Sequence, residues 1–188
     1  MDDQSIVSLF WARTDRAIAE TQVKYGPYCT RIARNILSDS GDSEETVSDT
    51  WLAAWNAIPP DRPVSLAPYL GRITRNLALN RLKARQADKR GGGALPLSLQ
   101  ELEECIPASS RLEEGVEARE LGEKIGEFLR REPGEARKIF VLRYFYCESV
   151  SDIAKSLGCT QSKVKSALAR TRDRLRRFLQ EEGLLYEG

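Results

Sequence analysis

The stretch SVSDIAKSLGCTQSKVKSALARTRDRLRRF, residues 149–178, predicts two helices joined by a tight turn. Ser149 or Ser151 can cap the first helix, because a serine hydroxyl accepts a hydrogen bond from a free amide of the first turn. Gly158 can take the left-handed conformation that ends a helix, and Thr160 can cap the helix that follows. This arrangement is typical of a DNA-binding helix-turn-helix.

The apolar residues of this stretch have the spacing that two closely crossing helices need. Ile153 and Leu157 face inward on the first helix, and the small side chain of Ala154 lets the second helix cross close by. The inward stripe of the second helix consists of Val164, Leu168, Leu175, Phe178 and Leu179. The alternative is a basic amphipathic helix on a plain helical hairpin, but the small residue, the glycine and Val164 fall together where the turn needs them.

The remaining positions of the second helix are mostly polar or basic, and they point outward. In a helix-turn-helix this helix lies in the major groove, where Lys and Arg bind guanine acceptors and Gln pairs with adenine. We therefore predict that base edges are contacted by Gln161, Ser162, Lys163, Lys165, Ser166, Ala169 and Arg170. Farther along, phosphates are the predicted partners of Arg172, Arg174, Arg176 and Arg177.

Positive charge gathers in two zones, although the formal net charge is only +1. Residues 68–90 form the first basic zone, which follows an acidic stretch at 38–50. Residues 155–177 form the second, which follows acidic residues at 101–123. A charge run is usually a solvated helix face, but two basic zones that end two helical blocks favour an elongated polyanion as the partner.

Composition excludes several kinds of function. The 188 residues include no histidine, which removes a nucleophile–histidine dyad and a mixed Cys/His metal site, and we expect neither a metal nor a cofactor. The cysteines are scattered without a C-x-x-C pair, and we expect reduced thiols at Cys29, Cys105, Cys147 and Cys159. Because no long apolar run and no secretion signal occur, we expect a cytoplasmic protein without membrane insertion.

The N-terminal half reads as a series of helices. The sequence YGPY predicts that one helix ends near Tyr25 and that another begins with Pro27 in its first turn. Asp42 or Ser43 can cap a further helix. The buried face predicted for that helix consists of Val47, Trp51, Leu52 and Trp55.

Prolines and glycines then divide the chain. Two prolines end this helix, and a long helix is predicted over residues 68–85. A glycine triplet begins the best candidate for a flexible linker, which we predict over residues 91–110. These signals predict an all-α fold with two small helical domains, at residues 1–90 and 111–182.

Three pieces of the chain, in order, resemble the extracytoplasmic-function (ECF) sigma factors, which are two-domain initiation factors of bacterial RNA polymerase. The piece YCTRIARNILSDSGDSEETVSDTWLAAWNAI resembles the part of region 2 that binds the polymerase clamp. The piece PYLGRITRNLALNRL resembles the helix that recognises the downstream promoter element, the minus-ten box. The piece FVLRYFYCESVSDIAKSLGCTQSKVKSALARTRDRLRRFL resembles region 4, which reads the upstream element, the minus-thirty-five box.

The resemblance implies partners and residue roles. The implied partners are core RNA polymerase, bound at its β′ clamp and β flap, promoter DNA, and an anti-sigma factor. Residues implied for the clamp are Glu45, Ser48, Asp49, Leu52 and Trp55. The downstream element is implied to contact a loop at 59–67 and the helix after it, at Asp61, Arg62, Val64, Ser65, Tyr69, Arg72, Arg75, Asn76 and Asn80. The upstream element is implied to contact Lys165, Ser166 and Arg170.

Two other functions are compatible with the same helix-turn-helix. A stand-alone repressor or activator would bind duplex DNA without polymerase, usually as a dimer. A DNA-processing enzyme such as a recombinase would need an activated nucleophile or a carboxylate metal site, and no such constellation stands out in the sequence. We therefore predict a transcription initiation factor that works with polymerase and is not itself an enzyme.

Overall fold

The structure is a computed structural model that describes residues 1–88, 96–103 and 116–184. These residues form helices, turns and loops, and no strand occurs among them. Contacts divide the chain into two compact units, Met1–Ala94 and Leu95–Gly188. No helix within the described ranges is both long and apolar enough to cross a membrane.

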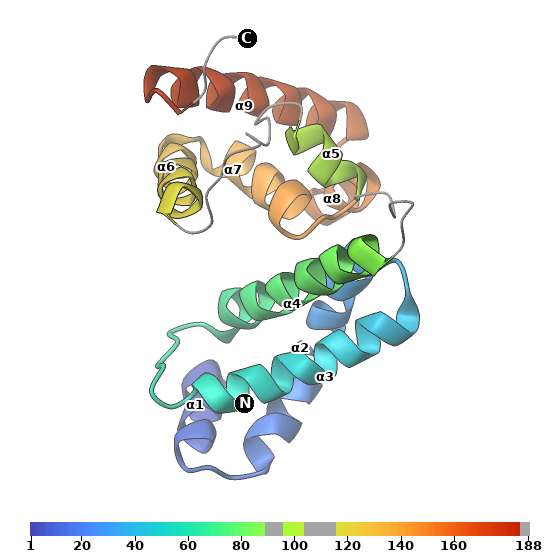
Figure 1. Cartoon of the computed structure of the whole chain (residues 1–188), viewed down its shortest axis with the longest axis vertical. Coiled ribbons are helices and arrows are strands. Elements are labelled where there is room, and N and C mark those ends of the chain that lie inside the picture. Colours follow the sequence, from blue (N-terminus) through green and yellow to red (C-terminus); the bar gives the residue numbers. More distant parts are fainter. Residues whose placement is uncertain (89–95, 104–115, 185–188) are drawn as a thin grey trace. The chain divides into compact units, whose positions relative to one another are not determined.

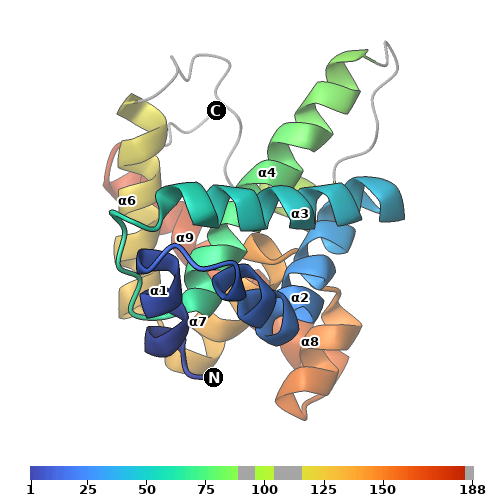
Figure 2. The same cartoon turned by 90° about the horizontal axis from the view of Figure 1, so that it is seen from below.

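The first unit is a bundle of helices α1 (Asp3–Trp11), α2 (Arg16–Leu37), α3 (Ser40–Ala57) and α4 (Leu66–Asp88). Helices α2, α3 and α4 pack against one another pairwise, and α1 packs on α2 (Figures 1 and 2). The core side chains are fully buried at Phe10, Ile58, Leu66 and Leu70. An apolar stripe on each helix therefore meets a common core, as the three-four spacing of the sequence predicts.

Helix α2 is continuous through Pro27, so the predicted helix break at YGPY is wrong. A proline inside a helix leaves the carbonyl four residues earlier without its donor. Here that carbonyl belongs to Val23, which is 83% exposed, so water can satisfy it. The stripe on either side of the proline, including Tyr25 and Cys29, is buried in the same core and holds the two halves in line.

Helix α3 begins three residues earlier than its predicted caps. Asp39 is the N-cap, and its carboxylate accepts a hydrogen bond of 2.8 Å from the amide of Asp42. The buried face is also narrower than predicted, because Leu52 is 59% exposed while Trp51 is buried. Leu52 points about 100° away from Trp51 around the helix axis, and on α3 this direction faces solvent, whereas Thr50, Trp51 and Ala54 are buried.

The second unit contains α5 (Leu97–Glu103), α6 (Val116–Arg131), α7 (Gly134–Phe140), α8 (Val150–Leu157) and α9 (Gln161–Glu181), with a π-helix η1 (Val141–Phe145) after α7. Pro133 separates α6 from α7. The core of this unit is built from Phe128, Ile139, Phe140, Tyr144, Ile153, Val164, Leu168, Leu175 and Leu179, all buried. The helix-turn-helix thus packs on the helices that precede it.

The predicted linker at 91–110 contains the ordered helix α5. Ser98 of this helix is 2% exposed, and α5 contacts η1 of the second unit. The segment is helical rather than linker because it packs on a helix distant in the sequence. Hydrophobic periodicity within the segment gives no information about such a contact. The glycine triplet at 91–93 and Cys105 lie outside the described residues. Cys29 and Cys147 are buried free thiols, and Cys159 is a partly buried one.

Candidate nucleic-acid and polymerase interfaces

The turn between α8 and α9 is built from local capping contacts. Ser149 caps α8 by accepting a hydrogen bond of 3.1 Å from the amide of Asp152. Gly158 ends α8 with a φ of 61°, the left-handed region that favours glycine. Thr160 caps α9 by accepting a hydrogen bond of 3.2 Å from the amide of Lys163. The predicted helix-turn-helix is therefore present, and of the two predicted serine caps it uses Ser149.

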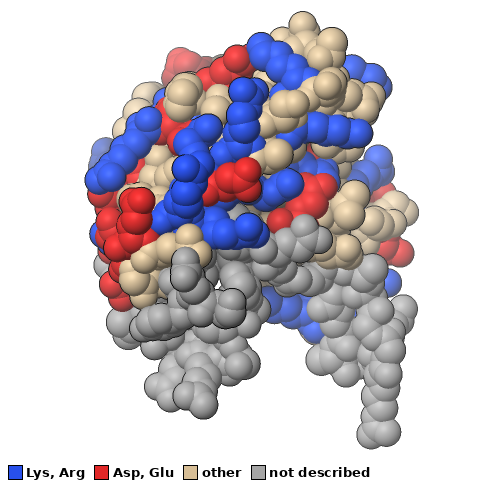
Figure 3. Space-filling view, turned by 90° about the horizontal axis from the view of Figure 1, so that it is seen from above, with Lys and Arg blue, Asp and Glu red and all other residues tan. Residues whose placement is uncertain are grey.

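One face of α9 is buried and the opposite face is open. The predicted inward residues are all buried: Val164, Leu168, Leu175, Phe178 and Leu179. The predicted base-reading residues are all exposed: Gln161, Ser162, Lys163, Lys165, Ser166, Ala169 and Arg170. Figure 3, which looks onto the α9 side of the second unit, shows many Lys and Arg side chains on this surface with Asp and Glu among them. The side chains that can reach a groove therefore lie together on one helix face.

Acidic neighbours contact part of this basic surface. Lys163 lies 2.6 Å from a carboxylate oxygen of Glu135, and this hydrogen bond and charge raise the pKa of Lys163. Both side chains are about half exposed, so the pair is solvated and easily exchanged for a phosphate or a base. The guanidinium of Arg170 donates to the carbonyl of Ser166 at 3.2 Å and stays on the exposed face.

Two of the arginines predicted to contact phosphates instead bind side chains of their own unit. Arg172 donates to the hydroxyl of Tyr144 at 2.6 Å and lies 3.6 Å from a carboxylate oxygen of Glu101. Arg174 donates from Nε and from one terminal nitrogen to the two carboxylate oxygens of Glu132, whose side chain is only 7% exposed. These contacts tie α9 to the helices beneath it, whereas Arg176 and Arg177 are exposed.

In the first unit, the α3–α4 loop (residues 58–65) leads into the face of α4 predicted to bind the downstream element. The hydroxyl of Tyr69 donates to the carboxylate of Asp61 at 2.7 Å. Burial, that hydrogen bond and the charge of Asp61 raise the pKa of Tyr69 to about 12, so the hydroxyl remains a donor. The guanidinium of Arg72 lies 5.7 Å from the centre of the same ring, a cation–π contact.

The remaining predicted residues of this region differ in exposure. Val64, near the end of the loop, is 87% exposed. Three- and four-residue spacing places Tyr69, Arg72, Asn76 and Asn80 on one face of α4. Asn76 and Asn80 are exposed, as are Arg62 and Ser65 in the loop, and Arg75 is partly buried. A polar face is thus continuous from the loop along α4.

The residues predicted to bind polymerase have several surroundings on α3. Ser48 and Leu52 are exposed. Glu45 and Asp49 both bind the guanidinium of Arg81 on α4, whose hydrogen bond and charge lower the pKa of Glu45. Trp55 is partly buried and packs against Phe10, with ring centres 6.1 Å apart. The outward face therefore combines an apolar side chain, a hydroxyl and carboxylates whose charge is partly compensated.

Helix α1 also contacts the α3–α4 loop, and its residues do not stand out in the sequence. Gln4 donates to loop carbonyls, and the ring of Trp11 lies against Arg62. These contacts join residues about sixty positions apart, so neither the spacing nor the composition of α1 signals them.

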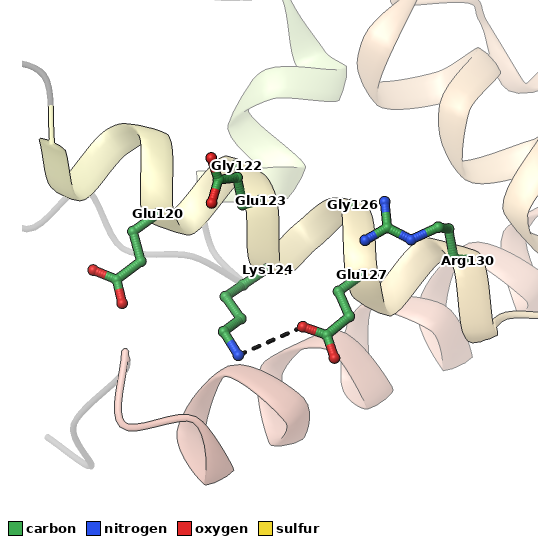
Figure 4. Close-up of a pocket in the computed structure, with 7 residues that line it drawn as sticks. All are labelled: Glu120, Gly122, Glu123, Lys124, Gly126, Glu127 and Arg130. Atoms are coloured by element: carbon green, nitrogen blue, oxygen red, sulfur yellow. Dashed lines mark ion pairs between the residues drawn. The ribbon is translucent and has the colours of Figure 1, made fainter.

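A hollow of about 690 Å³ lies along α6 in the second unit (Figure 4). The described residues that line it all belong to this helix: Glu120, Gly122, Glu123, Lys124, Gly126, Glu127 and Arg130. Lys124 lies between Glu127 and Glu182 of the residues after α9 and binds both. Small-molecule sites are concave and mostly apolar, so this charged surface is not a candidate for one.

Two stretches of the chain match known family models. Residues 23–87, which cover most of α2 and all of α3, and reach into the last turn of α4, match the model described as Sigma-70 region 2. Residues 123–175, from α6 into α9, match the model described as Sigma-70, region 4. The two matches fall in the two separate units, in the order that the sequence pieces predict.

Curated relatives with similar sequences are sigma factors. RNA polymerase sigma factor NccH of Alcaligenes xylosoxydans xylosoxydans is 30% identical over 165 residues, 87% of each chain. ECF RNA polymerase sigma factor SigM of Mycobacterium tuberculosis is 29% identical over 150 residues, 79% of this chain and 70% of that one. Probable RNA polymerase sigma factor RfaY of Xanthomonas campestris pv. campestris is 28% identical over 151 residues, 80% of this chain, and the matched part spans 37% of RfaY.

Proposed function

The chain belongs to the ECF group of the sigma-70 family, transcription initiation factors that direct RNA polymerase to promoters, and we propose how its two units divide this work. The first unit binds core polymerase through α3 and the downstream promoter element through the α3–α4 loop and α4. The second unit reads the upstream element with α9. The chain acts by binding and carries out no catalytic step of its own. It acts in the cytoplasm, where polymerase and promoter are found.

The exposed face of α9 carries the proposal for the upstream element. Seven outward residues from Gln161 to Arg170 follow directly after the turn at Gly158, so the N-terminal half of the helix can enter a major groove. Arg176 and Arg177 lie beyond this half and contact phosphates. Arg172 and Arg174, for which the sequence predicts phosphate contacts, instead position α9 on the unit, because each binds a partner within it.

Core polymerase contacts the outward face of α3 in this proposal. Leu52 is a large apolar side chain at 59% exposure, and Ser48 precedes it by one turn on the same face. Side chains that become fully buried on binding, surrounded by residues that exclude water, contribute most of the binding energy of protein interfaces. Arg81 holds Glu45 and Asp49 on the other edge of this face, where they can meet a basic clamp surface. An anti-sigma factor, which the family resemblance implies, would cover these faces.

Binding of the full chain to core polymerase tests this assignment. Leu52→Asp places a charge in the centre of the α3 face and should weaken binding by about tenfold or more. Val23→Asp is the matched control, because Val23 is an 83% exposed apolar residue on α2. Equal binding by both variants would remove α3 from the interface. Tight duplex binding without any affinity for core polymerase would favour a stand-alone repressor.

A further inference from the structure

Helix α1 makes five polar or stacking contacts with the α3–α4 loop and the first residue after it. The side-chain nitrogen Nε2 of Gln4 donates to the backbone carbonyl oxygens of Pro63 and Val64, at 3.4 and 3.1 Å. The indole nitrogen of Trp11 donates to the carbonyl oxygen of Asp61 at 3.3 Å. The guanidinium carbon of Arg62 lies 3.7 Å from the centre of the Trp11 ring. Figure 2 shows the loop passing alongside α1.

The entry to α4 is tied to the same helix. The carboxylate of Asp3 accepts a hydrogen bond of 2.8 Å from the amide of Leu66, the first residue of α4. Burial alone would raise the pKa of Asp3, but hydrogen bonds from Lys24, Tyr25 and Leu66 outweigh it and lower that pKa. Asp3 is therefore ionised at neutral pH and remains a strong acceptor.

The contacts of α1 are directed at the backbone of the loop. Two donors make three hydrogen bonds to this backbone: Gln4 Nε2 binds the carbonyls of Pro63 and Val64, and Trp11 Nε1 binds the carbonyl of Asp61. A carbonyl that is hydrogen-bonded to a rigid helix keeps its direction, and the side chains between such anchors keep theirs. Val64 is left 87% exposed beside these anchors, and the guanidinium of Arg62 lies over the indole ring of Trp11.

On the basis of the proposed function, we infer that Gln4 and Trp11 are positioning residues that hold the α3–α4 loop in the shape that selects an unpaired base of the downstream element. Base capture requires a preformed pocket, because ordering a loop on binding weakens the complex. A loop released from α1 would still carry the same side chains but would sample several shapes. It would therefore lose selectivity between bases more than it loses affinity for polymerase.

The test uses the full chain with core polymerase and a promoter library randomised over the downstream element. In Gln4→Ala and Trp11→Ala, the ratio between the preferred base and the other bases at the position read by the loop should fall about three- to tenfold, which corresponds to the loss of one such contact. Trp11→Phe keeps an aromatic surface under Arg62 and should retain part of the preference. Ser8→Ala is the control, because the Ser8 hydroxyl bonds to the carbonyl of Gln4 within α1.

Two further measurements separate the outcomes. Affinity for core polymerase and preference at the upstream element should be unchanged in all variants, and circular dichroism should report an intact fold. Unchanged downstream preference in folded Gln4→Ala and Trp11→Ala would overturn the inference, as would an equal loss of polymerase affinity. A wild-type chain that shows no downstream preference at all would instead overturn the proposed function.

Discussion

Glu101 of α5 accepts two hydrogen bonds from the guanidinium of Arg143, at 2.6 and 3.1 Å, although Arg143 has a side chain that is only 6% exposed. The same guanidinium also donates to the carbonyl of Glu148 at 2.8 Å, next to the N-cap of α8. Arg143 therefore joins α5 to the start of the helix-turn-helix through buried, charge-assisted hydrogen bonds. A segment that the sequence marks as linker contributes in this way to the second unit.

We expect Glu101→Gln to destabilise the second unit, because it leaves the buried charge of Arg143 without its carboxylate. The loss should be about 1.5–3 kcal/mol, the range for hydrogen bonds to charged groups. Urea unfolding would measure it, and hydrogen exchange should show faster exchange in α5. Glu135→Gln removes a half-exposed, solvent-screened pair with Lys163 and should change the free energy of unfolding much less. Equal losses in the two variants would contradict a structural role for the Glu101–Arg143 pair.

Base and phosphate contacts should respond differently to substitution on α9. Arg170→Ala removes a side chain from the base-reading half of the helix, so selectivity at one upstream position should relax by about 1–3 kcal/mol. Arg176→Ala should weaken binding evenly across sequences and lower the salt dependence of affinity. Titration of promoter variants at several salt concentrations would distinguish them, and identical behaviour would show that our division of the helix is wrong.

Any side chain at Gly158, in the turn between α8 and α9, should lower the stability of the second unit. The Gly158 φ of 61° is strained for an L-residue, so Gly158→Ala should destabilise the unit by about 1 kcal/mol, although its added methyl group would meet open space. Gly122→Ala, on α6 and also in open space, should be stabilising by a similar amount, because alanine favours a helix. Thermal unfolding of both variants checks this, and shifts of the same sign would contradict it.

The Cys29 thiol should be inert at pH 8. Burial raises the pKa of Cys29 to about 11, and a hydrogen bond with Thr74 offsets this only in part. Since the folded pKa is above the unfolded one, this group contributes stability that is complete below about pH 8.5 and is lost as the pH rises toward 11. Alkylation followed by mass spectrometry should label partly buried Cys159 before Cys29. Equal rates in the folded protein would contradict the burial effect.

Local chemistry made the helix-turn-helix predictable. Ser149, Gly158 and Thr160 contact residues three or four positions away, so their roles can be read from the sequence. The predicted helix break at Pro27 was wrong, because burial of the apolar stripe on both sides of the proline outweighs its local tendency to end a helix. Packing of α5 and the contacts of α1 with the α3–α4 loop depend on residues some forty to sixty positions apart, which no spacing rule reports.

The sequence predicted which helix faces are exposed more accurately than it predicted the partners of individual residues. Helical periodicity placed the seven predicted base-reading residues of α9 outward, and all seven are exposed. It could not show that Arg172 and Arg174 bind Tyr144 and Glu132, because both outward and inward-leaning arginines look alike in a basic stretch. Charge pairing across helices is decided by the tertiary fold.

Promoter-library transcription tests the central claim most directly, with both promoter elements randomised and the full chain added to core polymerase. We predict initiation from templates enriched in two separated motifs, with Arg170→Ala altering only the upstream one and Gln4→Ala only the downstream one. No initiation above core polymerase alone, or enrichment of a single motif that both substitutions alter, would contradict the division of promoter reading between the two units.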